Sequence, residues 1–146
     1  MNKLAIGLAV LLSGCSSQPP ASLGSHNGIL SPCPARPNCV SSQLEVTDDH
    51  YITPFSLIDG SDWENLVSTL GAMDNIEIVT RQDNYLHAEA TSKLFGFVDD
   101  LEFVRAAPQR LIHVRSASRI GYSDLGVNRD RIEQLRHQLN KRKKSK

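Results

Sequence analysis

The sequence predicts an α+β fold, a two-layer α/β sandwich in which two helices cover one face of a four-stranded, mainly antiparallel meander. Three observations predict it. Two segments carry apolar residues at helical spacing, four strand-like runs lie between them, and the links between those runs are short. Parallel neighbours would need crossovers of a dozen or more residues, so short links favour antiparallel pairing. With 146 residues, 40% of them hydrophobic, the chain can form one domain with a single core.

The two predicted helices flank the strands. The first is expected to begin at Ser61, a candidate N-cap with Glu64 three residues later, and to stop near Asn75. Its apolar positions are Trp63, Leu66, Val67, Leu70 and Met73. The second is expected to begin at Asn128, a candidate N-cap followed by Asp130 in the first turn. Its apolar positions are Ile132, Leu135 and Leu139.

The four strand-like runs are Ile76 to Arg81, Tyr85 to Thr91, Phe95 to Val104 and Arg110 to Ser118. Side chains alternate between the two faces of a strand. One face of the second run holds Leu86, Ala88 and Ala90, and one face of the third holds Phe95, Phe97, Leu101 and Phe103. This apolar face is expected to pack against the helices.

Asp99 interrupts the apolar face of the third run. A buried carboxylate is costly unless it is paired. We therefore expect either an ion pair with an arginine of the segment 115–119 or a bulge that turns Asp99 outward. Asp99 and its neighbour Asp100 are the candidates for a buried ion pair.

The opposite face of the predicted sheet is polar. It collects His87, Glu89, Asp100, Glu102, His113 and Arg115. The first two of these, together with His113, could offer nitrogen and oxygen ligands to a metal ion. A solvated or partner-facing surface is the commoner meaning of such a face, so we expect no metal and no other cofactor.

The N-terminus is predicted to be a lipoprotein signal peptide. The apolar stretch Leu4 to Leu12 is too short to span a membrane. It ends in Leu12-Ser13-Gly14-Cys15, which is similar to a bacterial lipobox, so Cys15 is the expected site of lipidation, palmitate included. An ordinary signal peptide that precedes a cysteine is the alternative. Ser16 stands where inner-membrane retention signals usually place Asp, which favours the outer membrane and a domain that faces the periplasm.

Composition then divides the chain into four parts. Residues 1–14 form the predicted signal peptide, and residues 15–32 form a lipid anchor and a flexible tether rich in Ser, Pro and Gly. Residues 33–140 form a single α/β domain, and residues 141–146 form a basic tail.

Cys33 and Cys39 remain once Cys15 is lipidated. The compartment beyond the inner membrane is oxidising, so we expect these two cysteines to form a disulfide. Their spacing is not Cys-x-x-Cys, which speaks against a redox-active pair, and the sequence nearby offers no further ligands for a metal.

The formal charge is zero, but it is distributed unevenly. Residues 16–104 carry a net −10 and residues 105–146 a net +9. The overall balance argues against a nucleic-acid partner. Guanidinium groups interleaved with hydroxyls in the basic half suit an anionic ligand. The candidate ligand-binding residues are Arg115, Ser116, Ser118, Arg119, Tyr122, Asp124, Asn128 and Arg129. The alternative is that these arginines pair with the acidic half of the same domain.

Three segments resemble one known family, the domain of unknown function 1499. They are Cys33 to Ser42, Phe95 to Phe103 and Arg115 to Arg129, within a match that covers about residues 31 to 139. The family has no agreed activity, so the resemblance implies no reaction. Many of its members resemble secreted or lipid-anchored bacterial proteins, which agrees with the lipobox.

We therefore expect a lipid-anchored cell-envelope protein that is a binding or structural module. Its expected partners are the membrane, through the anchor, and an anionic small molecule, a lipid headgroup or an envelope protein. An envelope hydrolase that uses Asp99 or Asp100 with a nearby His is the alternative. In a third reading, the domain is purely structural, and residues 115–129 form ion pairs only within the protein, with Asp99, Asp100 and Asp124.

Overall fold

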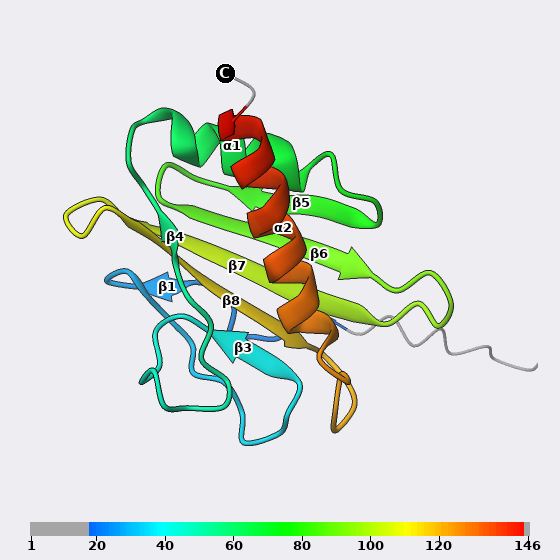
Figure 1. Ribbon diagram of the computed structural model, residues 1–146. Coiled ribbons are helices and arrows are strands. Elements are labelled where there is room, and N and C mark those ends of the chain that lie inside the picture. Colours follow the sequence, from blue (N-terminus) through cyan, green and yellow to red (C-terminus); the bar gives the residue numbers. More distant parts are fainter. Residues whose placement is uncertain (1–17, 145–146) are drawn as a thin grey trace, which may run out of the picture.

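The computed structural model describes residues 18–144, so the predicted signal peptide and Cys15 lie outside the described residues. Two helices and an antiparallel sheet make an α+β fold (Figure 1). The helices are α1 (Ser61–Leu70) and α2 (Val127–Lys144). The strands are β1 (Ser25–His26), β2 (Ile29–Leu30), β3 (Cys39–Ser41), β4 (Phe55–Ser56), β5 (Ile76–Arg81), β6 (Tyr85–Thr91), β7 (Val98–Ala106) and β8 (Leu111–Ser118). No helix among the described residues has the length and apolar character that crossing a bilayer requires.

The main sheet has six strands, so the prediction of four is wrong in detail. The order is β3-β8-β7-β6-β5, β4 also pairs with β8, and every pairing is antiparallel. The predicted meander is its β5–β8 part. β3 and β4 extend the sheet beyond β8, and with three and two residues they are too short to show an alternating pattern in the sequence.

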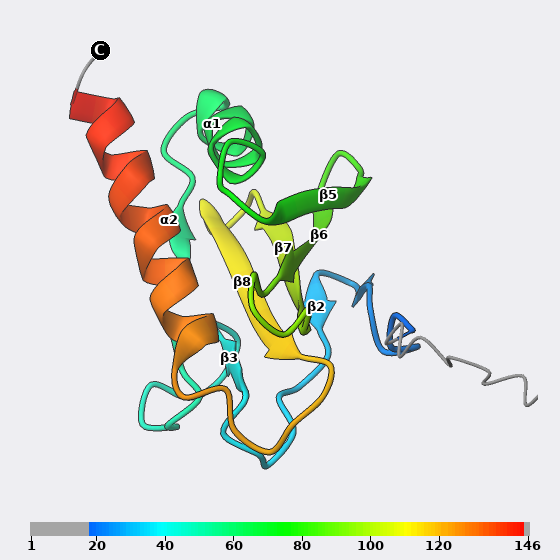
Figure 2. The same ribbon diagram turned by 90° about the vertical axis from the view of Figure 1, so that its right-hand side faces the viewer.

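Both helices cover one face of the sheet, as predicted (Figure 2). The main core lies between these layers and joins buried residues of α1 and α2 to Leu86, Leu101, Phe103 and Val114 of the strands. Seven residues of β6 pair with seven of β7 in continuous register through Asp99. The bulge that would have turned Asp99 outward therefore does not form.

The helix ends differ from the prediction at several points, and α2 begins at Val127, so Asn128 lies inside the helix and does not cap it. Ser61 does not cap α1; instead the Asp62 carboxylate accepts hydrogen bonds from the backbone N–H groups of Ile58 (2.6 Å) and Asp59 (3.2 Å). The helix ends at Leu70, before Asn75. At the other end of the chain, α2 runs through residues 141–144, which were expected to be a tail. There Lys143 pairs with Asp62 at 2.7 Å, so the basic residues hold the two helices together.

The third strand begins three residues later than predicted, at Val98, and Phe95 and Phe97 are exposed rather than buried. Gly96 explains the difference, because its φ of +66° is a left-handed conformation that favours glycine and breaks the strand. The resulting loop is closed on Ser92, whose backbone carbonyl accepts the N–H of Gly96 and whose hydroxyl accepts the N–H of Phe97.

Part of the polar face of the sheet is covered by the N-terminal segment, residues 18–32, which was expected to belong to the lipid anchor and flexible tether of residues 15–32. Its strands β1 and β2 pair as a hairpin, and Leu30 is buried with Tyr85 and Val104. Gln43 fixes the hairpin by accepting the N–H of Leu30 and donating to the carbonyl of Gly28. The fold therefore has a third layer here, which no periodic pattern in this short polar segment could reveal.

Cys33 and Cys39 form the predicted disulfide, with 5.6 Å between their Cα atoms. It connects the end of the N-terminal segment to the first residue of β3. The disulfide removes conformational entropy from the unfolded chain. Because the loop that it closes is short, the stabilisation is only about 2 kcal/mol.

Candidate functional site

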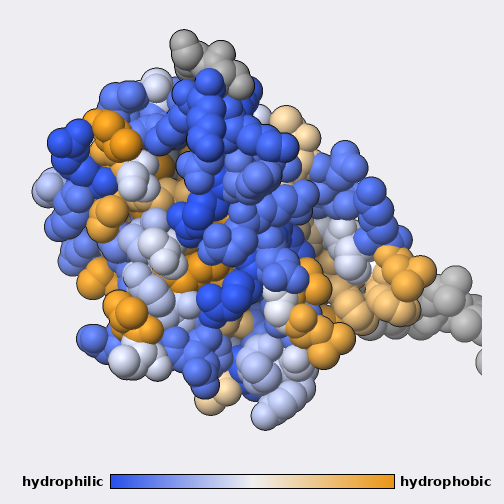
Figure 3. All heavy atoms as spheres, viewed as in Figure 1, coloured by the Kyte–Doolittle hydropathy of each residue, from blue (hydrophilic) through white to orange (hydrophobic). Residues whose placement is uncertain are grey.

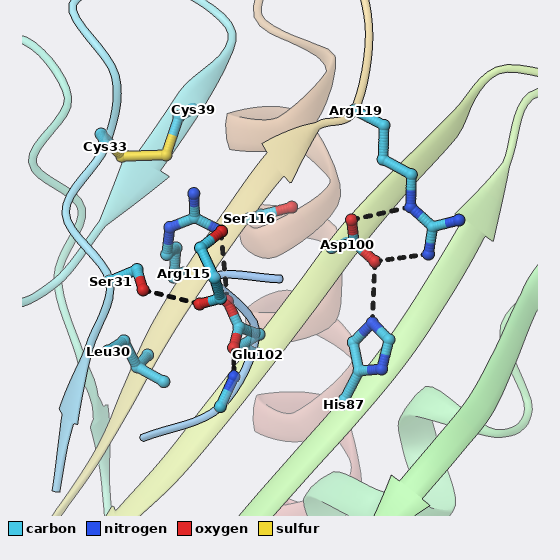
Figure 4. A network of polar contacts seen from close by, with 12 residues as sticks. Leu30, Ser31, Cys33, Cys39, His87, Asp100, Glu102, Arg115, Ser116 and Arg119 are labelled. Atoms are coloured by element: carbon cyan, nitrogen blue, oxygen red, sulfur yellow. Dashed lines mark hydrogen bonds and ion pairs between the residues drawn. A yellow bond between two sulfur atoms is a disulfide. The ribbon is translucent and has the colours of Figure 1, made fainter. Parts of the chain in front are cut away.

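A charged cluster around Asp100 lies buried on the polar face of the sheet (Figure 4). Asp100 is 1% exposed. Arg119 donates to both of its carboxylate oxygens, from Nε at 2.9 Å and from Nη2 at 2.7 Å, and it also pairs with Glu89. His87 Nε2 lies 2.8 Å from Asp100 Oδ1. Asp100 thus has an arginine partner. We expected a solvated or partner-facing surface on this side of the sheet, but His87 and Asp100 are buried rather than solvated.

A second buried cluster centres on Glu102, which has no exposed surface. Its Oε2 accepts a hydrogen bond from Arg115 Nη1 at 3.1 Å. Its Oε1 accepts the hydroxyl of Tyr85 and the backbone N–H of Gly24, both at 2.8 Å. Burial, together with the charge of Glu102, raises the pKa of Tyr85 well above its usual value, so the hydroxyl stays a donor. Gly24 belongs to the N-terminal segment, so this carboxylate holds that segment on the sheet.

The residues suggested as metal ligands are only partly together. His87, Glu89 and Asp100 place their ligand atoms within 4.8 Å of one another, but His113 lies elsewhere, beside the hydroxyl of Ser42. The guanidinium of Arg119 contacts both carboxylates of the set. The protein thus supplies a cation of its own between these two carboxylates.

On the helix face of the sheet, Asp99 pairs with Arg131 of α2, at 2.6 Å between Oδ2 and Nη2. Arginines of the segment 115–119 were expected as its partners. Alternation explains the difference: Asp99 faces its cross-strand partner Ser118 on the helix side, whereas Arg115 and Arg119 project to the polar side.

Asn128, fully buried in the first turn of α2, organises the hydroxyls of β8. Its Oδ1 accepts the hydroxyl of Ser116 at 2.5 Å, and its Nδ2 donates to Ser118 Oγ at 3.0 Å and to Asp124 Oδ2 at 2.7 Å. Burial alone would raise the pKa of Asp124, but N–H groups of Asn128 and Gly126 outweigh it and keep that pKa below its usual value. This network joins β8 to the start of α2.

The predicted ligand-binding residues are therefore engaged within the protein, with one exception. Arg129 is among the engaged residues, because it donates to the backbone carbonyls of Tyr51 and Asp49, both at 2.8 Å. Tyr122 alone of the predicted set projects into solvent. The arrangement matches the internal pairing of the third reading, although several partners differ from those proposed there.

The pH dependence of folding should report on Asp100. Burial would raise the pKa of its carboxyl, but hydrogen bonds from Arg119 and His87 outweigh burial and hold the pKa below its usual range. Such a group stabilises the fold above its unfolded pKa, about 3.9, and that contribution is lost as pH falls through the lower folded value. We expect urea unfolding to show a loss of stability below about pH 4. Asp100→Asn should flatten this decline, and the exposed Asp83→Asn should leave it unchanged; equal slopes for all three proteins would contradict the assignment.

Exposed apolar side chains gather at one end of the sheet. Of the eleven large hydrophobic side chains exposed among the described residues, seven lie in residues 92–97, between β6 and β7, or in residues 119–127, which lead into α2. We call these two stretches the loop end. Its apolar members are Leu94, Phe95, Phe97, Ile120, Tyr122, Leu125 and Val127. Leu94 is 81% and Leu125 92% exposed, and the two phenylalanine rings stack at 5.5 Å. Figure 3 shows hydrophobic atoms at the right of the molecule, over the loop between β6 and β7.

A cavity of about 490 Å³ opens beside the loop end. It lies between two of the segments that carry the family resemblance, Pro37 to Val40 on one side and Ser123 to Gly126 on the other. A hydrogen bond from the N–H of Asp124 to the carbonyl of Pro37, at 3.3 Å, joins the two. Arg129 and His50 also line the cavity, but both are bonded to neighbouring protein atoms.

Sequence reasoning missed the loop end because it assigned Phe95 and Phe97 to the core. Gly96 between them and the Ser92-Lys93 pair before them are the signal that could have marked a loop. Reasoning by strand alternation also missed Arg131, whose position on a helix gives no indication of which strand residue it meets.

The chain was compared with curated proteins, with solved structures and with family models. Neither curated proteins nor solved structures match it. A family model matches residues 29–139, which include the whole main sheet and most of α2. The chain therefore belongs to the family described as protein of unknown function DUF1499.

Proposed function

We propose that this protein is a lipid-anchored cell-envelope protein whose domain is a binding or structural module. Acyl chains on Cys15 would anchor it to the outer membrane, with the domain facing the periplasm. The lipobox-like Leu12-Ser13-Gly14-Cys15 and the serine that follows it support this proposal. Several acyl chains on one cysteine suffice for stable anchoring without a spanning helix.

One observation carries the binding part of the proposal: the charged groups of the polar clusters have partners within the protein, while apolar side chains are left exposed at the loop end. An anionic ligand at residues 115–129 would have to compete with oxygens that already accept from Arg115, Arg119 and Arg129. We therefore place binding at the loop end, because a patch of exposed apolar residues on a small protein is typical of an interaction site.

A hydrolase is the second candidate, and the hydrogen bond between His87 and Asp100 is the observation that favours it. Asp99 has an arginine partner and no histidine, so Asp100 would be the acid of such an enzyme. Both members of the pair are buried, and the cavity nearest them reaches Glu89 but neither His87 nor Asp100. Hydrolysis of a model ester that disappears in His87→Gln would favour this candidate.

Metabolic labelling tests the anchor. Cells that express the protein with radiolabelled palmitate should yield a labelled protein in the outer-membrane fraction of a density gradient. Cys15→Ala should remove the label and release the protein from the membrane. The double variant Cys33→Ala, Cys39→Ala is the matched control, because it removes two cysteines and should keep the label. An unlabelled wild type, or a Cys15→Ala protein that stays bound, would show that the proposal is wrong.

A further inference from the structure

We propose that the loop end is a membrane-docking face, whose apolar side chains lie among the phospholipid headgroups of the bilayer that holds the acyl anchor. This inference rests on the proposed function, since it takes Cys15 to be lipidated. It names the partner of the loop end as a lipid surface rather than a second protein.

The composition of the loop end suits a bilayer interface. It presents aliphatic and aromatic side chains together with Tyr122 and Lys93, whose apolar bodies and polar tips match the boundary between acyl chains and headgroups. The two loops leave the sheet from neighbouring strand ends, because the N–H of Arg119 donates to the carbonyl of Val98 at 3.2 Å and Asp99 pairs with Ser118. Figure 1 shows both loops at this end of the sheet, one projecting to the right and the other to the bottom.

The start of the described chain lies at the same end of the sheet. In Figure 1 this blue start is in the right half of the molecule, on the side where the loop between β6 and β7 projects. Figure 2 draws it at the height of that loop but apart from it, on the polar side of the sheet. Cys15 precedes Gln18 by three residues. Three residues of fully extended chain reach about 11 Å, so an acyl group on Cys15 would keep Gln18 close to the bilayer surface. An anchor this short brings this end of the domain, and not the opposite one, to the lipid.

The basic residues at the C-terminus point the other way. α2 starts at the loop end and runs for 18 residues, a length of about 27 Å. Its last turn is held on α1 by Lys143, which pairs with Asp62, and by Arg142, which donates to Ser68 and Thr69. With the loop end on the membrane, these cations face away from it. Docking should therefore depend on apolar contact and little on salt.

Tryptophan scanning tests the proposal on the full chain. The sequence has a single tryptophan, Trp63, which is buried, so Trp63→Phe gives a silent background. Phe95→Trp and Leu125→Trp place the probe in the two loops. Ile58→Trp is the matched control, because Ile58 is an exposed aliphatic residue at the opposite end, where Arg110 donates to its carbonyl. If Trp63→Phe impairs folding, Trp63 is kept as a constant buried signal and subtracted.

The proteins are purified from membranes and placed in phosphatidylglycerol and phosphatidylethanolamine vesicles with brominated acyl chains. Apolar groups at an interface lie about 5–10 Å into the boundary region, so bromine should quench the probes at 95 and 125 about twofold more than the probe at 58. Quenching should persist at high salt. Equal quenching at all three positions would overturn the inference. So would a blue shift that grows with protein concentration without lipid, which would identify a second copy as the occupant.

The mass of the Cys15 peptide from the same samples separates the two proposals. Quenching on a chain that carries no acyl group would contradict the proposed function but support the docking face. An acylated chain whose loop probes are quenched no more than the probe at 58 would contradict the docking face alone.

Discussion

Replacement of Glu102 by glutamine is expected to lower the free energy of unfolding by about 3–5 kcal/mol, the usual effect of breaking a buried ion pair. Glutamine keeps the size of the side chain and one acceptor for the Tyr85 hydroxyl and the Gly24 N–H. It removes the negative charge, so Arg115, itself buried, loses its ionic partner. Chemical denaturation monitored by circular dichroism measures the change.

The matched control is Glu64→Gln. Glu64 also pairs with an arginine, Arg81, but both side chains are at least half exposed, so its loss should change stability by only about 0–1 kcal/mol. A double variant, Glu102→Gln with Arg115→Met, should recover part of the loss, because it removes both buried charges. If Glu102→Gln is no more harmful than Glu64→Gln, Glu102 does not have the structural role assigned to it here.

The helices and the β5–β8 meander could be predicted from the sequence because each has a clear period. The Trp63-to-Leu70 stripe and the alternation of Leu86, Ala88 and Ala90 identify the faces that the structure buries. Elements too short to repeat a period could not be predicted in this way. β3, β4 and the β1–β2 hairpin have two or three residues each, and they form because neighbouring strands and Gln43 satisfy their backbone groups.

The polar face shows a different limit of sequence reasoning. Alternation correctly collected His87, Asp100, Glu102 and Arg115 on one face, but polarity suggested exposure. These side chains are buried in pairs, with Glu102 opposite Arg115 across β7 and β8 and His87 beside Asp100. The N-terminal segment covers Glu102, to which the N–H of Gly24 donates. The ion pairs across strands could in principle have been predicted from the sequence, whereas the segment that covers them could not.

The uneven charge of the chain also has a structural meaning. The buried pairs Asp99–Arg131, Asp100–Arg119 and Glu102–Arg115 each join an acid from residues 16–104 to an arginine from residues 105–146. Lys143–Asp62 does the same between the helices. The net charges of −10 and +9 therefore cancel in part at contacts inside the domain. What these contacts leave at the surface of the loop end is apolar, which is why we place binding there.

Replacement of Arg119 by methionine is expected to have an effect of the same size, about 3–5 kcal/mol, and to change the response to acid as well. It leaves the buried Asp100 carboxylate close to Glu89 without the guanidinium that contacts both. The hydrogen bonds that hold the pKa of Asp100 down come mainly from Arg119, so this pKa should rise. Stability that Asp100 contributes at neutral pH should then be lost at a higher pH than in the wild type. Urea unfolding between pH 7 and pH 2 measures both effects.

Arg81→Met is the matched control, because Arg81 contacts the carboxylate of Glu64 in an exposed pair. Its loss should change stability by about 0–1 kcal/mol. The pH at which stability is lost in acid should stay as in the wild type. Arg119→Met combined with Asp100→Asn should recover part of the stability, since the second change removes the charge that the first left unpaired. Arg119→Lys keeps the charge but not the planar fork that bonds both oxygens, so it should fall between the wild type and Arg119→Met. A wild-type acid response in Arg119→Met would mean that His87, not Arg119, holds Asp100 ionised. The cluster would then retain the His87–Asp100 pair that the hydrolase alternative requires.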